Sequence, residues 1–232
     1  MKSSSHFWNK AVALITFALM LAGFSAWAQL PQMQKLFLEA PQEIIPTLGD
    51  VERTKIIEAF NQGSEYNAEV HPINNVLGGR VTLHQLTEDY IKLDLDSLTE
   101  LQMKVLPYKK RKNYVVALVA TSKVTPAQSV IAFFDKQWKK VDAPQLFNPF
   151  ESRDFFENPK DFEQREVKKA LVELGRLSYI IELSPQSPEL TVRTTTFDDL
   201  SSSPKSFSDP TPLLRKPGIV MEWNKKKGFA KK

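Results

Sequence analysis

Cysteine is absent from this sequence of 232 residues, and glycine occurs only eight times. Without cysteine the chain has no disulfide, no thiol nucleophile, no thiolate metal ligand and no attachment site for the lipid of a bacterial lipoprotein. The sequence contains no P-loop, no G-x-G-x-x-G motif and no G-x-S-x-G motif of serine hydrolases. Packing alone must therefore hold the fold together, and no common nucleotide or nucleophile motif indicates a reaction.

Histidine is also scarce, with three in the chain. Neither His71 nor His84 stands in an H-E-x-x-H or H-x-x-E-H pattern, which would bring two histidines together on a zinc ion. We expect both to be ordinary surface residues, with His84 facing solvent beside Thr82. The sequence predicts no metal site and no cofactor.

The first 28 residues have the pattern of a secretory signal peptide. Two lysines and no acid precede an apolar run over 11–24, and an A-x-A cleavage pattern at 26–28 predicts cleavage before Gln29. An uncleaved anchor is the alternative, because the 18 residues from 11 to 28 approach the roughly 20 that span a bilayer. No later run is apolar enough to span a membrane, so we predict a periplasmic or secreted protein.

The basic isoelectric point does not by itself indicate a nucleic-acid partner. Residues 215–232 hold seven basic residues against one acid, whereas residues 29–214 hold 22 basic and 26 acidic residues. A nucleic-acid binder spreads positive charge over one face of its folded body. We expect residues 223–232 to be a basic, disordered tail, with contact to an anionic surface or partner as the alternative.

Extended segments between 81 and 141 form the predicted centre of the fold. In YIKLDLD (90–96), hydrophobic residues at 91, 93 and 95 alternate with charged residues at 92, 94 and 96. This alternation predicts a strand with one face in the core and one in water, and such sheets are usually antiparallel. The continuous apolar runs 114–120 and 130–134 predict central strands that are covered on both faces. Trp138 follows a tight turn and is expected to be buried against the sheet.

The remaining segments predict helices, a connector and further strands. Apolar residues at helical spacing predict helices over 33–40, 50–62 and 161–174, with the Asp50 carboxylate capping the second. Prolines and phenylalanines in 142–159 predict an ordered connector that aromatic rings anchor to the core. A hairpin is expected at 177–183 and 190–196, a flexible loop at 201–212 and a last strand at 219–223.

The predicted fold class is therefore α+β: an antiparallel β-meander sheet with two N-terminal helices and one later helix packed on one face. Residues 29–222 are long enough to bury a core as one α+β domain. Two smaller halves, over 29–142 and 150–222, are the alternative.

The charged face of the predicted sheet and one turn are the candidate binding sites. The turn carries four consecutive basic residues flanked by Tyr108 and Tyr114, and basic surfaces with interleaved aromatic rings bind anionic chains. A charged hairpin tip that keeps the protein soluble is the simpler interpretation. The candidate binding residues are Lys92, Asp94 and Asp96 on the strand and Lys109, Lys110, Arg111 and Lys112 in the turn.

Paired carboxylates are the residues in this sequence that best fit a catalytic or metal-binding role, although the indication is weak. Asp94 and Asp96 share one strand face, and Asp198 and Asp199 follow a late strand. Two carboxylates can bind calcium or act as general acid and base, but calcium takes about six to eight oxygens and the D-x-D-G loop is missing. We interpret the first pair as part of a solvated strand face.

Three segments carry a resemblance that spans most of the chain after residue 33: MQKLFLEAPQEIIPTL (33–48), VTLHQLTEDYIKLDLDSLTELQMKVLP (81–107) and SVIAFFDKQWKKV (129–141). In these segments the chain resembles an uncharacterised family of exported proteins from Bacteroidetes-type bacteria, a domain of unknown function. The resemblance implies export, an envelope setting and an α+β fold, and it supplies no catalytic residues.

Three classes of function follow from the sequence. The first is a non-catalytic envelope protein that binds, or assembles with, another protein or a glycan. The second is a periplasmic hydrolase, in which Asp94, Asp96, Asp198 and Asp199 would meet in one cleft. The third is an inhibitor that presents a loop to the active site of a secreted enzyme. We prefer the first class because the sequence lacks any nucleophile, metal or phosphate motif.

Overall fold

The computed structural model describes residues 32–63, 72–109, 113–142, 144, 146–148, 150–174, 178–196, 198 and 213–232. Residues from Gln32 to Lys232 form one compact unit. Within the described ranges, no helix has the length and hydropathy needed to cross a bilayer. Several predictions concern residues outside these ranges: the signal peptide, His71, Lys110, Arg111, Lys112, Asp199 and the loop 201–212.

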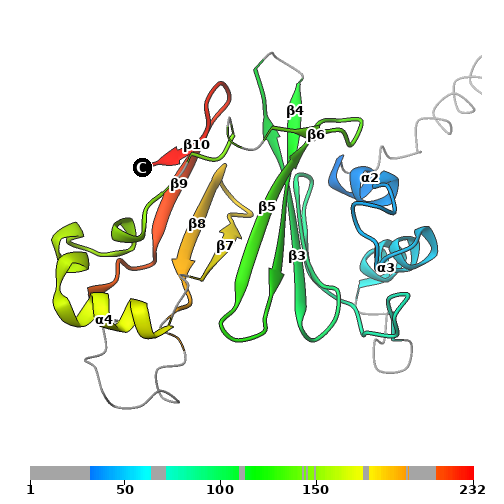
Figure 1. The fold of residues 1–232 in the computed structure, drawn as a ribbon. Coiled ribbons are helices and arrows are strands. Elements are labelled where there is room, and N and C mark those ends of the chain that lie inside the picture. The colour runs from blue at the N-terminus through cyan, green and yellow to red at the C-terminus, as the bar shows by residue number, and fades with distance from the viewer. Residues whose placement is uncertain are drawn as a thin grey trace, which may run out of the picture. The chain divides into compact units, whose positions relative to one another are not determined.

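The first sheet is an antiparallel meander of six strands, which pair in the order in which they follow along the chain (Figure 1). Its two longest strands pair from Thr99 opposite Ser122 to Pro107 opposite Tyr114. The meander expected from the sequence is thereby confirmed. The strands are β1 (Thr82–Leu86), β2 (Tyr90–Asp94), β3 (Thr99–Pro107), β4 (Tyr114–Ser122), β5 (Gln128–Phe134) and β6 (Lys140–Val141).

A second antiparallel sheet has the strand order β10-β9-β8-β7. The predicted hairpin and last strand are confirmed as β7 (Tyr179–Leu183), β8 (Glu189–Thr194) and β9 (Ile219–Asn224). The predicted disordered tail is wrong, because its residues continue β9, form a turn and then pair with β9 as β10 (Gly228–Lys231).

The end of the chain is ordered because β10 carries a residue of the hydrophobic core. Phe229 is fully buried, and its ring centroid lies 5.0 Å from that of Trp223 and 6.3 Å from that of Phe133. Gly228 has a φ of 79°, and a Cβ there would lie 2.2 Å from the Leu146 carbonyl oxygen. Burial of one phenylalanine thus fixes a segment that composition alone assigns to solvent.

Helices α2 (Gln32–Glu39) and α3 (Asp50–Gln62) cover one face of the first sheet (Figure 1). Met33, Phe37 and Ile56 of these helices belong to the same hydrophobic cluster as Leu93 and Met103 of the sheet. This cluster is the core that the alternation in the strands predicts.

The prediction that Asp50 caps α3 is wrong. The N-cap residue is Gly49, and no side chain caps the helix. The Asp50 carboxylate instead pairs with Arg53, whose side chain is 1% exposed. Because the Arg53 guanidinium also donates to the Ala40 carbonyl, this buried cation joins α3 to the end of the α2 segment.

The connector leads through η3 (Ser152–Phe155) and η4 (Pro159–Glu163) to α4 (Arg165–Leu174). Phe155 is buried, and the Phe150 ring makes edge contacts with Phe155 and Tyr179 at 5.4 and 5.1 Å. The predicted aromatic anchoring is confirmed, as is the α+β class with its three helices. Contrary to the prediction, the later helix does not share the face of the two N-terminal helices. Val167 of α4 instead belongs to a second hydrophobic cluster, to which both sheets contribute, because the anchored connector places α4 beside that cluster.

The charged face of the first sheet is not in water as the sequence predicts. Gln102 is 1% exposed and Lys104 is 3% exposed, although both alternate with core residues on β3. The second sheet packs over this face. The hydrophobic residues of this face and those of the second sheet together form the second cluster. On the other hand, β5 is covered less completely than expected, since Val130 is 64% exposed.

Trp138 is buried as predicted, with its ring centroid 5.7 Å from that of Phe134. We expect Trp138→Ala to lower the free energy of unfolding by about 3 to 5 kcal/mol, because the lost indole leaves a cavity. Denaturant titration measures this change. The control is Val130→Ala, where the side chain is already largely solvated and the expected loss is below about 0.5 kcal/mol. A loss below about 1 kcal/mol for Trp138→Ala would contradict the burial of this ring.

Candidate functional site

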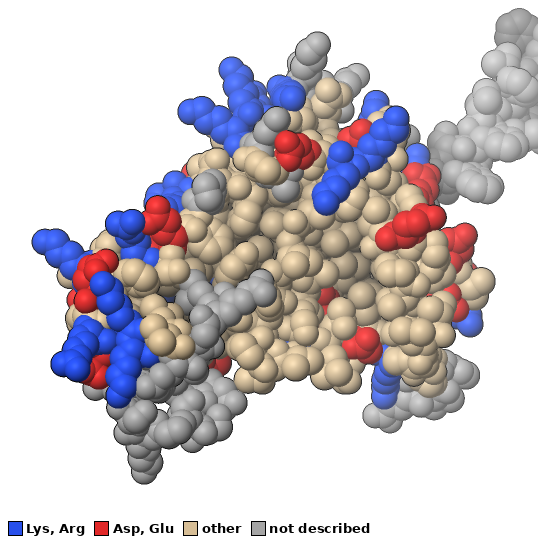
Figure 2. Space-filling view, viewed as in Figure 1, with Lys and Arg blue, Asp and Glu red and all other residues tan. Residues whose placement is uncertain are grey.

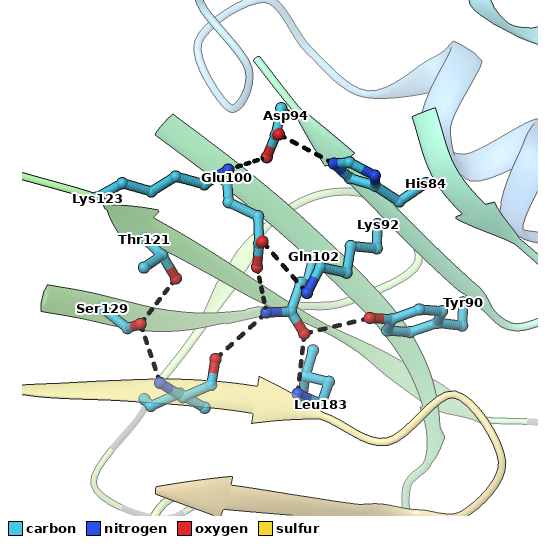
Figure 3. A network of polar contacts seen from close by, with 11 residues as sticks. His84, Tyr90, Lys92, Asp94, Glu100, Gln102, Thr121, Lys123, Ser129 and Leu183 are labelled. Carbon is cyan, nitrogen blue, oxygen red and sulfur yellow. Dashed lines mark hydrogen bonds and ion pairs between the residues drawn. The ribbon is translucent and has the colours of Figure 1, made fainter. Parts of the chain in front are cut away.

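Polar side chains form a strip across the face of the first sheet that the second sheet covers, with one bonded group around Gln102 and a separate one around Asp94 (Figure 3). Five successive segments of the meander supply them. We call these residues the polar strip: His84 on β1, Tyr90, Lys92 and Asp94 on β2, Glu100 and Gln102 on β3, Thr121 on β4, Lys123 after β4 and Ser129 on β5.

Gln102 connects the two sheets through both atoms of its amide group. Its Oε1 accepts from the backbone N–H of Leu183 at 2.9 Å, and its Nε2 donates to the carbonyl of Ile181 at 3.3 Å. The same amide accepts from the Tyr90 hydroxyl at 3.3 Å and donates to Glu100 at 2.9 Å. Each polar atom of this buried amide therefore has partners, which a buried amide requires.

The polar strip satisfies the edge of the second sheet. Strand β7 is the last strand of that sheet, so its outward backbone groups have no further strand to pair with. Gln102 bonds the carbonyl of Ile181 and the N–H of Leu183, and Ser129 Oγ accepts from the N–H of Ile181 at 2.9 Å. Thr121 in turn bonds Ser129 at 2.7 Å. Side chains of one sheet thus replace the missing strand of the other.

Asp94 lies at the outer end of the polar strip between a histidine and a lysine. Its carboxylate pairs with His84 Nε2 at 3.0 Å and with the Lys123 ammonium, and its side chain is 20% exposed. Burial opposes ionisation of this carboxyl, but the hydrogen bonds from Lys123 and His84 outweigh burial and lower its pKa. Asp94 is therefore held as a carboxylate.

The other titratable groups of the strip are also committed to partners. Glu100 pairs with Lys92 at 3.2 Å. Burial raises the pKa of Tyr90, and the charges of Glu100 and Glu182 raise it further, so the hydroxyl stays protonated as a donor. An acid held ionised and a phenol held neutral are poorly suited to exchange protons near neutral pH. Tyr90 and Asp94 are thus each held in one protonation state near neutral pH.

Two cavities lie away from the strip. One of about 350 Å³ is lined by Asp154, Glu157 and residues 215–220 and 231–232. The other, of about 340 Å³, lies between α3 and β1. Of the carboxylates proposed for a hydrolase, Asp94 and Asp96 line neither of these cavities, Asp198 pairs with Arg193 at 2.9 Å, and Asp199 lies outside the described residues. No three His, Asp or Glu side chains in the described ranges gather closely enough to hold a metal ion.

The candidate binding residues that the structure describes fall in three separate places, whereas Lys110, Arg111 and Lys112 lie outside the described residues. Lys92 and Asp94 belong to the polar strip, while Asp96 lies in the turn after β2, where its Oδ1 accepts from the Leu98 N–H at 2.7 Å. Lys109 lies at the opposite end of β3, with its ammonium 4.7 Å from the centroid of the Tyr108 ring. The structure therefore does not gather them into one site.

The sequence did not reveal two groups of residues. The first joins the two sheets, and the second is Lys225, which lies beside the basic turn. Gln102 and Ser129 resemble solvated strand residues in the sequence, so only the second sheet reveals their role. Lys225 was assigned to a disordered tail, yet its carbonyl accepts from the N–H of Lys109 at 2.8 Å. Nothing in the local sequence indicates either contact.

The contact between the sheets can be tested at Gln102. In Gln102→Met the side chain keeps its length but loses its amide, so two backbone groups of β7 lose their partners. We expect the free energy of unfolding to fall by about 2 to 6 kcal/mol, since each unsatisfied buried group costs about 1 to 3 kcal/mol. Gln137→Met is the matched control, because Gln137 is exposed and its side chain has no hydrogen bond in the described part of the chain. Equal unfolding midpoints for the two variants would refute the role of Gln102.

The Asp94 cluster predicts a dependence of stability on pH. Because the pKa of Asp94 is lowered in the folded state, its contribution is complete above the unfolded pKa, near 3.8, and is lost as pH falls through the folded value. Asp94→Asn removes the charge at every pH. We therefore expect the wild-type protein to be more stable than the variant at neutral pH, with a difference that shrinks below about pH 4. Urea titrations across this range measure the difference, and a constant difference would contradict the prediction.

Comparisons with known proteins identify a family but no activity. A family model described as a protein of unknown function (DUF3256) matches residues 25–228. No curated protein matches the sequence. A solved structure of a domain of an uncharacterized protein from Porphyromonas gingivalis W83 is similar, with a TM-score of 0.68 and 20% identity, over 87% of this chain and 98% of that one. At this identity the similarity concerns the fold alone. The chain belongs to the DUF3256 family of proteins of unknown function.

Proposed function

We propose that this protein is a non-catalytic binding or assembly module of the bacterial cell envelope. The observation that carries the proposal is that the side chains of the polar strip are engaged in contacts within the protein. These side chains bond one another and the edge of β7, and the acids among them pair with cations. The sheet face that the sequence offers for chemistry is thus a contact inside the protein.

The envelope setting is supported by the start of the chain. Residues 1–28 combine a basic start, an apolar run and an A-x-A pattern, as in proteins exported from the cytoplasm. The absence of cysteine means that the chain needs no oxidation after export. Packing of two sheets and two clusters provides the stability instead.

A rigid sheet pair suits a module that presents its turns to a partner. Strands β3 and β4 pair without a bulge over nine residues each, so the ends of the two strands at Pro107 and Tyr114 are held together. Hydrogen bonds between the sheets prevent them from sliding, because a one-residue shift would leave backbone groups unpaired. Turns on such a scaffold lose little entropy on binding.

Binding to envelope material tests the proposal directly. Residues 29–232, which contain the whole compact unit, are mixed with envelopes of a Bacteroidetes bacterium and sedimented. We expect saturable binding of the folded protein, no binding of the heat-unfolded protein and no release of soluble sugars or peptides. Membrane, peptidoglycan and soluble fractions then locate the bound component.

The Asp94→Asn variant is the matched test against a hydrolase that uses the paired carboxylates, because Asp94 is one of the carboxylates that such an enzyme would need. The substitution removes one charge of the polar strip while keeping the shape of the side chain. If the protein is a binding module, the folded variant binds envelopes as the wild type does, with lower stability only. Release of sugars by the wild type that the variant fails to release would contradict the proposal and favour the hydrolase.

A further inference from the structure

Two turns of the first sheet lie at the same end. Strand β3 ends at Pro107, which is paired with Tyr114 at the start of β4. Strand β5 ends at Phe134, which is paired with Val116, only two residues further along β4. The end of β3, which is followed by Lys109, and the turn after β5 therefore lie at one end of the meander.

A third turn, between β9 and β10, is joined to the first of these. The Lys109 N–H donates to the Lys225 carbonyl at 2.8 Å, and Trp223 Nε1 donates to the Pro107 carbonyl at 2.7 Å. Figure 1 shows this turn at the top of the view, beside the upper ends of β4 and β6. The two hydrogen bonds make one surface from turns that belong to different sheets.

Lysines gather on this surface, and we call them the basic end. All are exposed, and none forms an ion pair with a described residue. Figure 2 shows blue side chains over the same end of the molecule. The basic end consists of Lys109, Lys136, Lys139, Lys140, Lys225, Lys226 and Lys227.

Lysines elsewhere in the described chain are commonly neutralised. Pairs with carboxylates form at Lys92, Lys104, Lys123, Lys168, Lys231 and Lys232. Acids also lie near the basic end, among them Asp135 in the turn after β5 and exposed Asp142 after β6, but no ion pair joins a described acid to a lysine of the basic end. The Asp135 Oδ1 accepts from the N–H groups of Gln137 and Lys139 within its own turn, and Asp89 pairs with Lys104. Lysines without an ion-pair partner among the described residues thus follow β3, β5 and β9.

We propose that the basic end binds a membrane surface through its anionic lipid headgroups. This inference rests on the proposed function, since it names the envelope component that the module contacts. Lysine is a compact point charge on a flexible stem, which suits many anionic groups spread over a plane better than one precisely shaped ligand. Lysines on three neighbouring turns can approach such a plane together.

A nucleic acid or another linear polyanion fits this surface less well. Proteins that hold single strands combine a positively charged groove with exposed aromatic faces on which bases stack. Neither described cavity includes a residue of the basic end, and the Lys109 ammonium lies over the Tyr108 ring. The described lysines of the basic end therefore line neither of the two cavities above.

Cosedimentation with lipid vesicles tests the inference. Residues 29–232 are mixed with vesicles of phosphatidylcholine alone or with added phosphatidylglycerol, at low and at high salt. We expect binding only to the anionic vesicles, weakening as salt rises. The triple variant Lys225→Glu, Lys226→Glu, Lys227→Glu should bind at least about 100-fold more weakly, because each lysine near anionic headgroups contributes roughly a fivefold gain.

Two further variants make the result specific. Lys55→Glu, Lys160→Glu, Lys216→Glu is the matched control, since it reverses three exposed lysines outside the basic end with the same change of net charge. It should bind within about twofold of the wild type. Lys136→Glu, Lys139→Glu changes a different turn and should weaken binding at least about tenfold, so the test stands even if the first variant does not fold.

Three outcomes would overturn the inference. One is an equal loss of vesicle binding in the control variant, and another is equal binding to vesicles without phosphatidylglycerol. The third is displacement from vesicles by single-stranded DNA or an acidic polysaccharide at matched charge, which would assign the surface to a polymer. If the basic-end variant still binds whole envelopes like the wild type, the proposed function stands and this site fails. If the wild type binds no envelope material, the proposed function itself fails.

Discussion

The contact between the two sheets depends on one unpaired strand edge and the side chains that satisfy it. Strand β7 ends the second sheet, and Gln102 and Ser129 of the first sheet bond its outward backbone groups. Buried backbone groups without partners are costly, so the hydrogen bonds fix where the second sheet can lie. The position of the connector, of α4 and of the turns at the basic end follows from this docking.

Most of the fold could be predicted from local patterns, whereas the pairing of the two sheets could not. The alternation at 90–96 gave the strand and its core face correctly. The prediction that the opposite face lies in water failed. A buried glutamine that bonds another strand, such as Gln102, and a solvated glutamine look alike in sequence. Periodicity reports which residues share a face, but it does not report what covers that face.

The candidate site shows the same division. Lys109 was found from its basic turn, and the structure keeps it exposed. Its neighbour Lys225 could not be found, because the sequence gives no indication that residues 116 positions apart, Trp223 and Pro107, are hydrogen-bonded. The tail prediction failed for a related reason: five lysines in 223–232 masked the single Phe229 that a distant cluster buries. One residue can be charged and exposed while its neighbour is buried. The overall composition of a segment does not show this difference between neighbouring residues.

The second cluster also sets an order in which the chain can fold. The first sheet is built from neighbouring hairpins, so its contacts are local and can form early. The cluster between the sheets combines residues from Tyr90 to Phe229, so it closes only when nearly all of the described chain is present. Until then the face of Gln102 is uncovered and its partners are absent. The meander can therefore form before its Gln102 face is covered.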